Sequence, residues 1–410
     1  MRLLQSILPR DHHTKKPQRK FLTHLFGLLL MLPGHMTFRN LSRYSPYHEK
    51  TCARWSARGF DCVALNKAAI TAVVPPEPAQ ALVMDASFVP KSGKATYGLD
   101  RFWNGRHRRT EKGVEISALA WLDITDNCAY CLSAAQTPPA DKAPDAEATR
   151  IAVSLAPLAR VVSAYHLRHL RNVSTEGYDS TQTFFRGVRA LGLEQIGTLR
   201  LDAHLRARYQ GLQRSGPGRP KTSDGKVYWH NLAQFEKVET EDEHRVLSQQ
   251  VLNHVQFQRN LRVVLVVATK HHRKAVLLRT DLNVEALTVY RYYKARFHIE
   301  LLCRDAKQFT GLTDCQARSQ ATLHFHCNAS LSAVTLAKLD ARQQSGDAAT
   351  AVSMARRMRR AFHQHLIERI SRHVAEGHSL EKSSPAYEEL CNYGTITEMA
   401  AGILAEVLPD

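Results

Sequence analysis

Apolar residues recur along the chain with two different spacings, and the change between them divides the sequence into regions. Residues 1–77 have helical spacing, first in FLTHLFGLLLML and then in TFRNLSRYSPYHEKTCARWSARGF, which predicts a helix, a Ser-Pro turn and a second helix. The segment VVPPEP (73–78) predicts a stiff linker. We therefore expect a helical N-terminal region over 1–77.

Short apolar runs follow the linker and predict strands alternating with helices. Three of them, ALVMDASF (81–88), GVEISALAWLDI (113–124) and CAYCLSAAQ (128–136), lie at hairpin distances from one another. The pattern then predicts a helix over 146–169, a strand at RNVSTEGY (171–178), a helix in TQTFFRGVRALGL and a strand at TLRLDA (198–203). Residues 78–211 thus have the order three strands, helix, strand, helix, strand.

The second half of the chain begins with a further β-rich stretch. Residues 212–282 contain a loop, GPGRPKTSDGK, and then the strand candidates KVYW, VQF, LRVVLVVA and AVLLRT. A helix is predicted to start near Val284, within a region that we place at 283–340. Residues 341–410 are helical and basic, as ARRMRRAFHQHLIERISRHV shows.

The helix that starts near Val284 has an unusual third face. At about 100° per residue, Tyr293, Arg296, Glu300 and Lys307 fall within an arc of roughly 60°, apart from the apolar arc. One interpretation is a surface lattice of ion pairs. The other is a functional face on which one carboxylate lies among cations.

The charge of the chain favours a polyanionic partner. Its 410 residues exceed what one core accommodates, and its 56 Lys and Arg against 38 Asp and Glu give a formal net charge of +18, spread along most of the length. Nucleic acid is the first candidate and an anionic membrane the second, with a merely basic protein as the alternative. In 48–58, cations surround Trp55 in a helix that suits DNA binding or an ordinary basic helical pair.

The number of cysteines and the two clearest groups of cysteine and histidine predict neither a disulfide framework nor a metal site. Eight cysteines are too few for a disulfide scaffold in a chain of this length. Cys128 and Cys131 form C-x-x-C, but residues three apart on a strand point to opposite faces. His324, His326 and Cys327 form a looser cluster that we expect to serve packing.

The N-terminus resembles a signal peptide but lacks its essential parts. Basic residues precede an apolar run of 12 residues, which is too short to cross a bilayer, contains His24 and is followed by no small-residue cleavage site. We expect a buried helix and a cytoplasmic protein that does not enter a membrane. A peripheral membrane protein would rest on residues 15–32 alone.

The order of strands matches an α/β fold of the ribonuclease-H-like type, a mixed sheet here with a β-rich insertion and flanked by helical regions. In that fold the first and fourth strands are neighbours at the centre of the sheet. An acid at the end of each, with a third on a late helix, can hold two divalent cations for phosphoryl transfer. Asp85 is at the end of the first predicted strand, and Glu300 is on the late helix.

The spacing Y-(2)-R-(3)-E-(6)-K in Tyr293, Arg296, Glu300 and Lys307 resembles the DDE transposases of bacterial insertion sequences, in the branch with a β-strand insertion before the last acid. DASFVPKSGKATYGLDRFWNG resembles the family's block around the first acid, and FTGLTDCQARSQATLHFHCNAS resembles the segment after the last. The resemblance covers about residues 35–395.

This resemblance implies a DNA transposase that binds terminal inverted repeats as a homodimer and acts on target DNA. Two Mg²⁺ ions, for which Mn²⁺ substitutes, would be held by Asp85, Glu300 and a second acid, and would support hydrolysis followed by strand transfer. Arg296, Lys307 and Tyr293 would hold phosphates of the transposon end. Trp229 would stack on a flipped base or, equally, be a core tryptophan.

The second acid departs from the family pattern. Family members have Asp-Gly-Tyr where this chain has Glu176-Gly177-Tyr178. Asp202 is the rival, but it ends the predicted fifth strand, two inter-strand steps of about 4.8 Å from the first. We therefore choose Glu176. Its additional methylene displaces the carboxylate, so the alternative function is a catalytically impaired DNA-binding remnant or repressor.

Overall fold

The structure is a computed structural model of the chain and divides it into two compact units. It describes residues 2–8, 14–32, 34–77, 79–138, 146–167, 169–176, 181–213, 220–229, 234–270, 273–345 and 353–395. The first unit consists of Met1–Pro75, Val89–Gly113 and Leu302–Asp410. The second consists of Pro76–Phe88 and Val114–Leu301.

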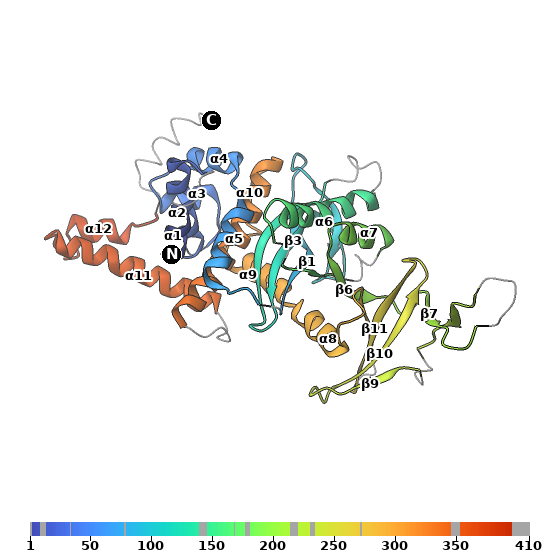
Figure 1. The fold of residues 1–410 in the computed structure, drawn as a ribbon. Coiled ribbons are helices and arrows are strands. Elements are labelled where there is room, and N and C mark those ends of the chain that lie inside the picture. The colour runs from blue at the N-terminus through green and yellow to red at the C-terminus, as the bar shows by residue number, and fades with distance from the viewer. Residues whose placement is uncertain are drawn as a thin grey trace. The chain divides into compact units, whose positions relative to one another are not determined.

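The first unit is mainly helical, as the N-terminal pattern predicts (Figure 1). Its N-terminal helices are α1 (Arg2–Ile7), α2 (Lys16–Leu29), α3 (Phe38–Arg43), α4 (Glu49–Arg58) and α5 (Cys62–Val73). The sequence sets their starts: the side chain of Thr37 caps α3 by accepting from the amide of Asn40, and Asp61 caps α5 in the same way. The helix, turn and helix predicted in 37–58 are confirmed as α3 and α4.

A long buried helix, α10 (Gln320–Ser345), organises this unit. It packs against α1, α2, α4 and α5. The buried side chain of Asn66 on α5 donates a hydrogen bond of 2.8 Å to the hydroxyl of Ser332 on α10. The helices α11 (Met354–Ala375) and α12 (Pro385–Cys391) follow and contact each other. The described residues include no helix long and apolar enough to cross a membrane.

The described residues form a mixed sheet of twelve strands, most of which belong to the second unit. Its order is β2-β3-β1-β5-β6-β12-β11-β10-β7-β8, with β4 paired to β3 and β9 paired to β10. The strands are β1 (Gln80–Pro90), β2 (Asp100–Asn104), β3 (Arg109–Asp123), β4 (Cys128–Gln136), β5 (Asn172–Ser174), β6 (Glu194–Leu199), β7 (Leu205–Arg208), β8 (Ser223–Lys226), β9 (Glu236–Val238), β10 (Arg245–His254), β11 (Arg259–Ala268) and β12 (Lys274–Arg279). The β-rich stretch predicted to be an insertion continues this sheet, because β12 pairs with β6.

The strand order at the sheet centre is confirmed. The first predicted strand, β1, pairs in parallel with the fourth, β5, and β5 pairs in parallel with β6. Other parts of the strand prediction are wrong. The strands β2, β7, β9 and β10 are missing from it, so four strands and not three precede the helix predicted over 146–169. The fifth strand lies four residues earlier than TLRLDA, at 194–199. VQF forms the turn between β10 and β11, where Gln258 has a positive φ of 53°, and KVYW shares only Lys226 with a strand.

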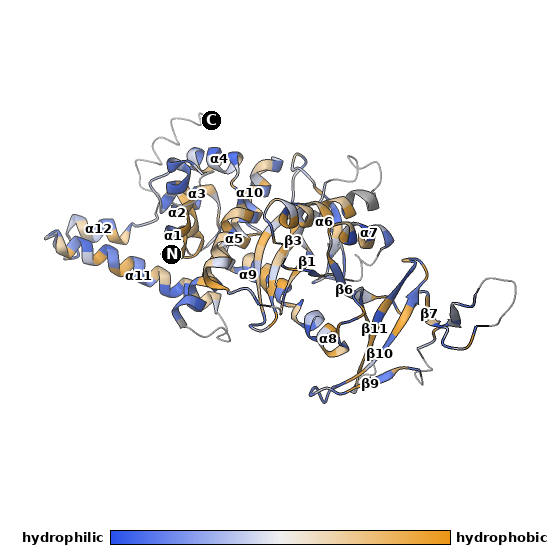
Figure 2. Cartoon of the chain, viewed as in Figure 1, coloured by the Kyte–Doolittle hydropathy of each residue, from blue (hydrophilic) through white to orange (hydrophobic). Residues whose placement is uncertain are grey.

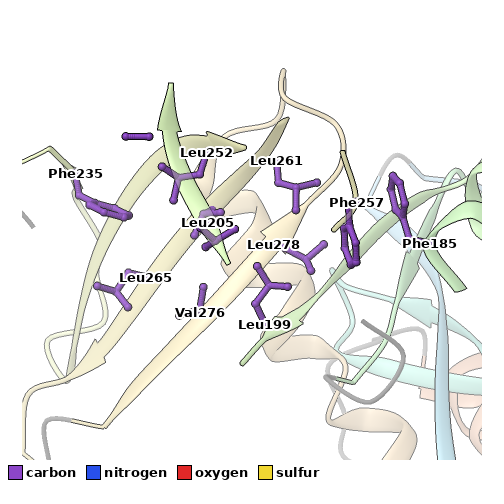
Figure 3. Packing of buried hydrophobic residues seen from close by; sticks show 12 residues of the cluster. Phe185, Leu199, Leu205, Phe235, Leu252, Phe257, Leu261, Leu265, Val276 and Leu278 are labelled. Atoms are coloured by element: carbon purple, nitrogen blue, oxygen red, sulfur yellow. The ribbon is translucent and has the colours of Figure 1, made fainter. Parts of the chain in front are cut away.

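Apolar side chains pack on both faces of β10, β11 and β12, because successive residues of a strand point to opposite faces. In Figure 2 this part of the sheet contains segments in the hydrophobic colour. On one face, Leu252, Leu261 and Leu278 form a cluster with Phe257 and with Phe185 of α7 (Gln182–Ala190) (Figure 3). On the other face, α8 (Ala286–Ala295) packs over β6 and β10–β12. The helix α6 (Ala146–Ser163) packs against β4 and α7.

Candidate active site

Two of the predicted acids lie on neighbouring parallel strands. Asp85 is inside β1, which is longer than predicted and continues to Pro90, and Glu176 comes two residues after β5. The register pairs Leu82 with Val173 and Val83 with Ser174. Continuing this register by two residues would bring Asp85 opposite Glu176. The strand pairing therefore explains why the two carboxylates approach each other.

The side chain of Arg296 joins both of these acids to the third. Its Nη2 lies 2.8 Å from Oε1 of Glu176 and 2.8 Å from Oε1 of Glu300. Its Nη1 lies 3.9 Å from Oδ1 of Asp85. Because both glutamate oxygens lie 2.8 Å from the same nitrogen, the distance between them is at most twice that value. Asp85, Glu176 and Glu300 thus surround one guanidinium group.

Burial differs across this cluster and sets its electrostatics. The side chains of Arg296 and Asp85 are 9% and 13% exposed, whereas those of Glu300 and Glu176 are 38% and 51% exposed. Burial raises the pKa of Asp85 to about 7, and the charges of Glu176 and Glu300 add to the rise while Arg296 opposes it. Burial lowers the pKa of Arg296, but the surrounding carboxylates outweigh this, so that its pKa lies above the usual value.

The prediction of one continuous helix through this segment is wrong. α8 ends at Ala295, α9 (His298–Phe309) follows, and Arg296 and Phe297 form a turn between them. Several main-chain bonds here span three residues instead of four, as from the amide of Glu300 to the carbonyl of Phe297. The helix is tightened at Arg296, the residue whose side chain pairs with all three acids. The sequence gives no warning of it, because the turn contains neither glycine nor proline.

Tyr293 lies between the acid cluster and a pocket of about 690 Å³. The guanidinium carbon of Arg296 lies 5.8 Å from the centre of its ring. The pocket is lined by residues just before and at the start of β10 and by residues of α8, among them Asp242, His244, Arg245, Arg291 and Lys294. The sequence prediction did not single out Asp242, His244 and Arg245, because TEDEHR has the composition of a solvated loop.

The other predicted residues lie in different surroundings. Lys307 is half-buried on α9, seven residues after Glu300. Trp229 is half-buried, donates from Nε1 to the carbonyl of Leu201 at 2.6 Å and packs against the cluster that contains Phe235. Trp229 therefore packs against the edge of this cluster and remains partly exposed. Asp202 lies in a turn after β6 with its side chain 68% exposed, and it pairs with Arg200 at 2.9 Å.

The donor set suits hard divalent cations. Mg²⁺ and Mn²⁺ prefer oxygen ligands, and three carboxylates converge here. Arg296 already places one positive charge among them, and its Nε and Nη1 have no hydrogen-bond partner among the residues that the structure describes. The arrangement accepts a cation, and a divalent ion would compete with Arg296 for the same oxygen atoms.

Residues 10–262 of the sequence match a family model. That family is described as the DDE superfamily endonucleases. The matched segment contains Asp85 and Glu176 and ends before Glu300. No curated protein matches the chain. More than half of the sequence lies in the matched segment, and the chain therefore belongs to the DDE superfamily endonucleases.

Proposed function

We propose that the protein is a DNA transposase of a bacterial insertion sequence, from the branch with the Y-(2)-R-(3)-E-(6)-K spacing and a β-strand insertion. It binds terminal inverted repeats and performs metal-dependent phosphodiester hydrolysis and strand transfer. The observation that carries the proposal is the convergence of Asp85, Glu176 and Glu300 on Arg296. The three acids come from two neighbouring strands and one late helix, an arrangement that supports a ribonuclease-H-like core.

In this proposal the three carboxylates hold two Mg²⁺ ions, or Mn²⁺ in their place. Bound there, the ions would activate the attacking oxygen and stabilise the leaving oxygen of an in-line displacement. Asp85 holds its ligand atom in the least exposed position, and Glu176 and Glu300 offer theirs from the more exposed side. Asp85 has to lose its proton before it can act as a ligand.

The residues around the acids position the DNA. Once released from the carboxylates, the guanidinium of Arg296 can bind a phosphate through two parallel hydrogen bonds. Tyr293 and Lys307 are proposed to contact the same transposon end. Trp229 would have to leave its hydrogen bond to Leu201 in order to stack on a flipped base. Its contacts favour a role in the core of the insertion.

We assign one part of the proposed function to each region of the chain. Residues 1–77 bind DNA, 78–211 and 283–340 form the two parts of the catalytic core, 212–282 form the β-rich insertion, and 341–410 form a C-terminal helical region. The net charge of +18 supports DNA as the partner, because phosphate neutralisation dominates such binding. A homodimer would pair the two element ends before joining them to target DNA in the cytoplasm.

A second candidate function is a DNA-binding remnant or repressor without efficient catalysis. Glu176 favours it, because the family resemblance places an aspartate there. A carboxylate displaced by one methylene can fold into the cluster and still hold metal poorly. The contact of Glu176 with Arg296 is compatible with both functions.

The experiment that tests both proposals uses the DNA that flanks the gene. Labelled fragments containing the inverted repeats are incubated with full-length protein in Mg²⁺ or Mn²⁺, next to a scrambled fragment of equal length. Specific binding with cleavage at the element end and joined products supports the transposase. Specific binding without cleavage in either metal supports the repressor. Equal binding to the scrambled fragment contradicts both.

A further inference from the structure

A local motif folds the chain back at the end of α11. The amide of His378 donates to the carbonyl of His373 at 3.0 Å, and the amide of Gly377 donates to the carbonyl of Val374 at 3.0 Å. Gly377 has a positive φ of 77°, as expected for the glycine of a Schellman motif. This motif brings the residues at positions 373 and 378 into contact. A hydrophobic contact frequently accompanies this motif, whereas here both residues are histidines.

Together with Glu376, the two histidines form a compact set of donor atoms. Nδ1 of His373 lies 3.3 Å from Nδ1 of His378, and the latter atom lies 3.5 Å from Oε2 of Glu376. In the part of the chain that the structure describes, this is the one group of three His, Cys, Asp or Glu residues whose donor atoms all lie within 4.8 Å of one another. The group is separate from the three acids of the proposed active site.

The spacing of these atoms suits a tetrahedral metal ion. Two nitrogens that bind zinc at about 2.0–2.1 Å with a tetrahedral angle between them are separated by roughly 3.3–3.4 Å. The observed 3.3 Å between the ring nitrogens corresponds to one edge of such a tetrahedron. Without a metal, the same distance is explained by one hydrogen bond between the imidazoles.

A nearby carboxylate is placed to orient one of the histidines. Nε2 of His373 lies 3.7 Å from Oε1 of Glu389 on α12, and Arg369 holds the same oxygen at 3.1 Å. Histidines that bind a metal through one nitrogen commonly direct the other towards a carboxylate. His373 has this arrangement, with Nδ1 towards the donor set and Nε2 towards Glu389. His378 and Glu376 are exposed, which leaves the remaining coordination position open to water.

We propose that His373, Glu376 and His378 bind one zinc-type transition-metal ion at the C-terminal end of α11. Two imidazoles and one carboxylate select Zn²⁺ and its neighbours over Mg²⁺, which prefers oxygen ligands only. Because Glu389 belongs to α12, the bound ion fixes the end of α11 against that helix. The proposed role of this metal ion is structural, and the proposal does not depend on transposase activity.

The test measures zinc bound by full-length protein prepared without a histidine tag. The protein is stripped with a chelator, dialysed against Zn²⁺ and analysed for metal content and melting temperature, and the same is done with Mg²⁺. The variants are His373→Ala, His378→Ala and Glu389→Gln. His363→Ala is the matched control, since His363 is an exposed histidine on the same helix. Zinc bound at other sites contributes equally to the unmodified chain and to the variants, so the difference in zinc content reports this site alone.

The expected result is that His373→Ala and His378→Ala each lose one equivalent of Zn²⁺ and the rise in melting temperature that Zn²⁺ causes. His363→Ala keeps both, and Glu389→Gln binds about 10–100-fold more weakly. Equal zinc content in the unmodified chain and both alanine variants would overturn the proposal. His378→Gln repeats the comparison with a side chain that retains hydrogen bonding, so that loss of the helix end is not mistaken for loss of a ligand.

Discussion

The guanidinium of Arg296 lies 2.8 Å from the carboxylate of Glu176, although Glu176 follows a central strand and Arg296 lies in the turn between two late helices. The contact brings Glu176, which departs from the family pattern, into the same cluster as Asp85 and Glu300. The guanidinium of Arg296 pairs with all three acids, so its contribution can be tested by replacing this one residue.

Replacing Arg296 should destabilise the chain most strongly when no divalent ion is present. Arg296→Ala leaves three carboxylates next to one another without a counter-charge. Loss of one partner of a buried pair costs about 3–5 kcal/mol, and the exposure of the two glutamates reduces this to about 1–3 kcal/mol. Thermal unfolding in a chelator and in Mg²⁺ measures the effect. Mg²⁺ should restore part of the lost stability.

The control for this experiment is Arg291→Ala, which removes an exposed arginine from α8, the helix that precedes Arg296. We expect it to change stability by less than about 0.5 kcal/mol, with or without metal. If both variants lose the same stability and Mg²⁺ restores neither, Arg296 does not act as the counter-charge of the three acids.

The stability of the metal-free protein should fall as pH rises through the range in which Asp85 loses its proton. Its pKa is about 7 in the folded chain, against an ordinary value of 3.8. Between these values the folded state binds more protons than the unfolded state, so the free energy of unfolding decreases with rising pH. The decrease amounts to roughly 4 kcal/mol at most. Above pH 7 this contribution is constant.

Denaturant unfolding at pH 5 and pH 8 in a chelator measures this slope. Asp85→Asn should flatten it, whereas Asp202→Asn should not, because Asp202 is exposed. Added Mg²⁺ should stabilise the unmodified chain more at pH 8 than at pH 5, since metal and proton compete for the carboxylate. An unchanged slope in Asp85→Asn would show that Asp85 is not the titrating group.

Glu300→Gln should abolish cleavage and leave binding to the element end nearly intact. The amide keeps the shape of the side chain and removes the charge that would hold a metal ion. Gel-shift titration and a cleavage assay on the same fragment separate the two effects, with Glu285→Gln at the start of α8 as the control. Cleavage by Glu300→Gln at nearly the unmodified rate in Mg²⁺ would exclude Glu300 as a metal ligand.

Lys307→Ala should weaken binding to the element end and reduce its salt dependence. One lost phosphate contact lowers the slope of log K against log salt by about 0.9. Lys307→Arg retains the charge and should retain the slope. Arg296→Ala should also reduce the slope if Arg296 exchanges its carboxylates for a phosphate. If the slope of log K against log salt is unchanged in Lys307→Ala, this lysine does not contact a DNA phosphate and instead takes part in ordinary ion pairs on the helix surface.

The sequence predicts the centre of the sheet well, because strand order follows from the alternation of apolar runs and helices. β1 and β5 are neighbours as expected. The alternating residues Leu199 and Leu201 lead to the prediction of β6 too far along the chain. Leu201 is half-exposed in a turn, but in the sequence it has the same spacing as a strand leucine. Periodicity also cannot show that the helix tightens at Arg296, because this turn contains no residue that breaks helices.

The candidate site could be predicted only in part, for a related reason. Asp85, Glu176 and Glu300 are recognisable by their order along the chain, but the contacts of Arg296 depend on the register between two parallel strands. The zinc site at the end of α11 depends on the positive φ of Gly377. On a straight helix, two residues five positions apart lie on different faces, so His373 and His378 come together only because the chain turns back at Gly377.

The choice between Glu176 and Asp202 has the sharpest test. Glu176 lies in the cluster, whereas Asp202 is exposed and paired with Arg200. Glu176→Asp shortens the side chain to the length found in the family that the sequence resembles. It should therefore raise cleavage, or create it where none is measured, while Asp202→Asn should change it less than about twofold, or by less than about 0.4 kcal/mol in activation free energy.

Both variants are best compared in Mg²⁺ and in Mn²⁺. Mg²⁺ demands near-ideal octahedral geometry, so a ligand displaced by one methylene should impair activity more in Mg²⁺ than in Mn²⁺. The unmodified chain should therefore gain more from Mn²⁺ than Glu176→Asp does. Glu176→Gln is the companion variant, because it keeps the length and removes the charge, and it should be inactive in both metals. If Asp202→Asn eliminates cleavage while Glu176→Asp and Glu176→Gln leave it unchanged, the second acid is Asp202, and the contact between Glu176 and Arg296 serves folding alone.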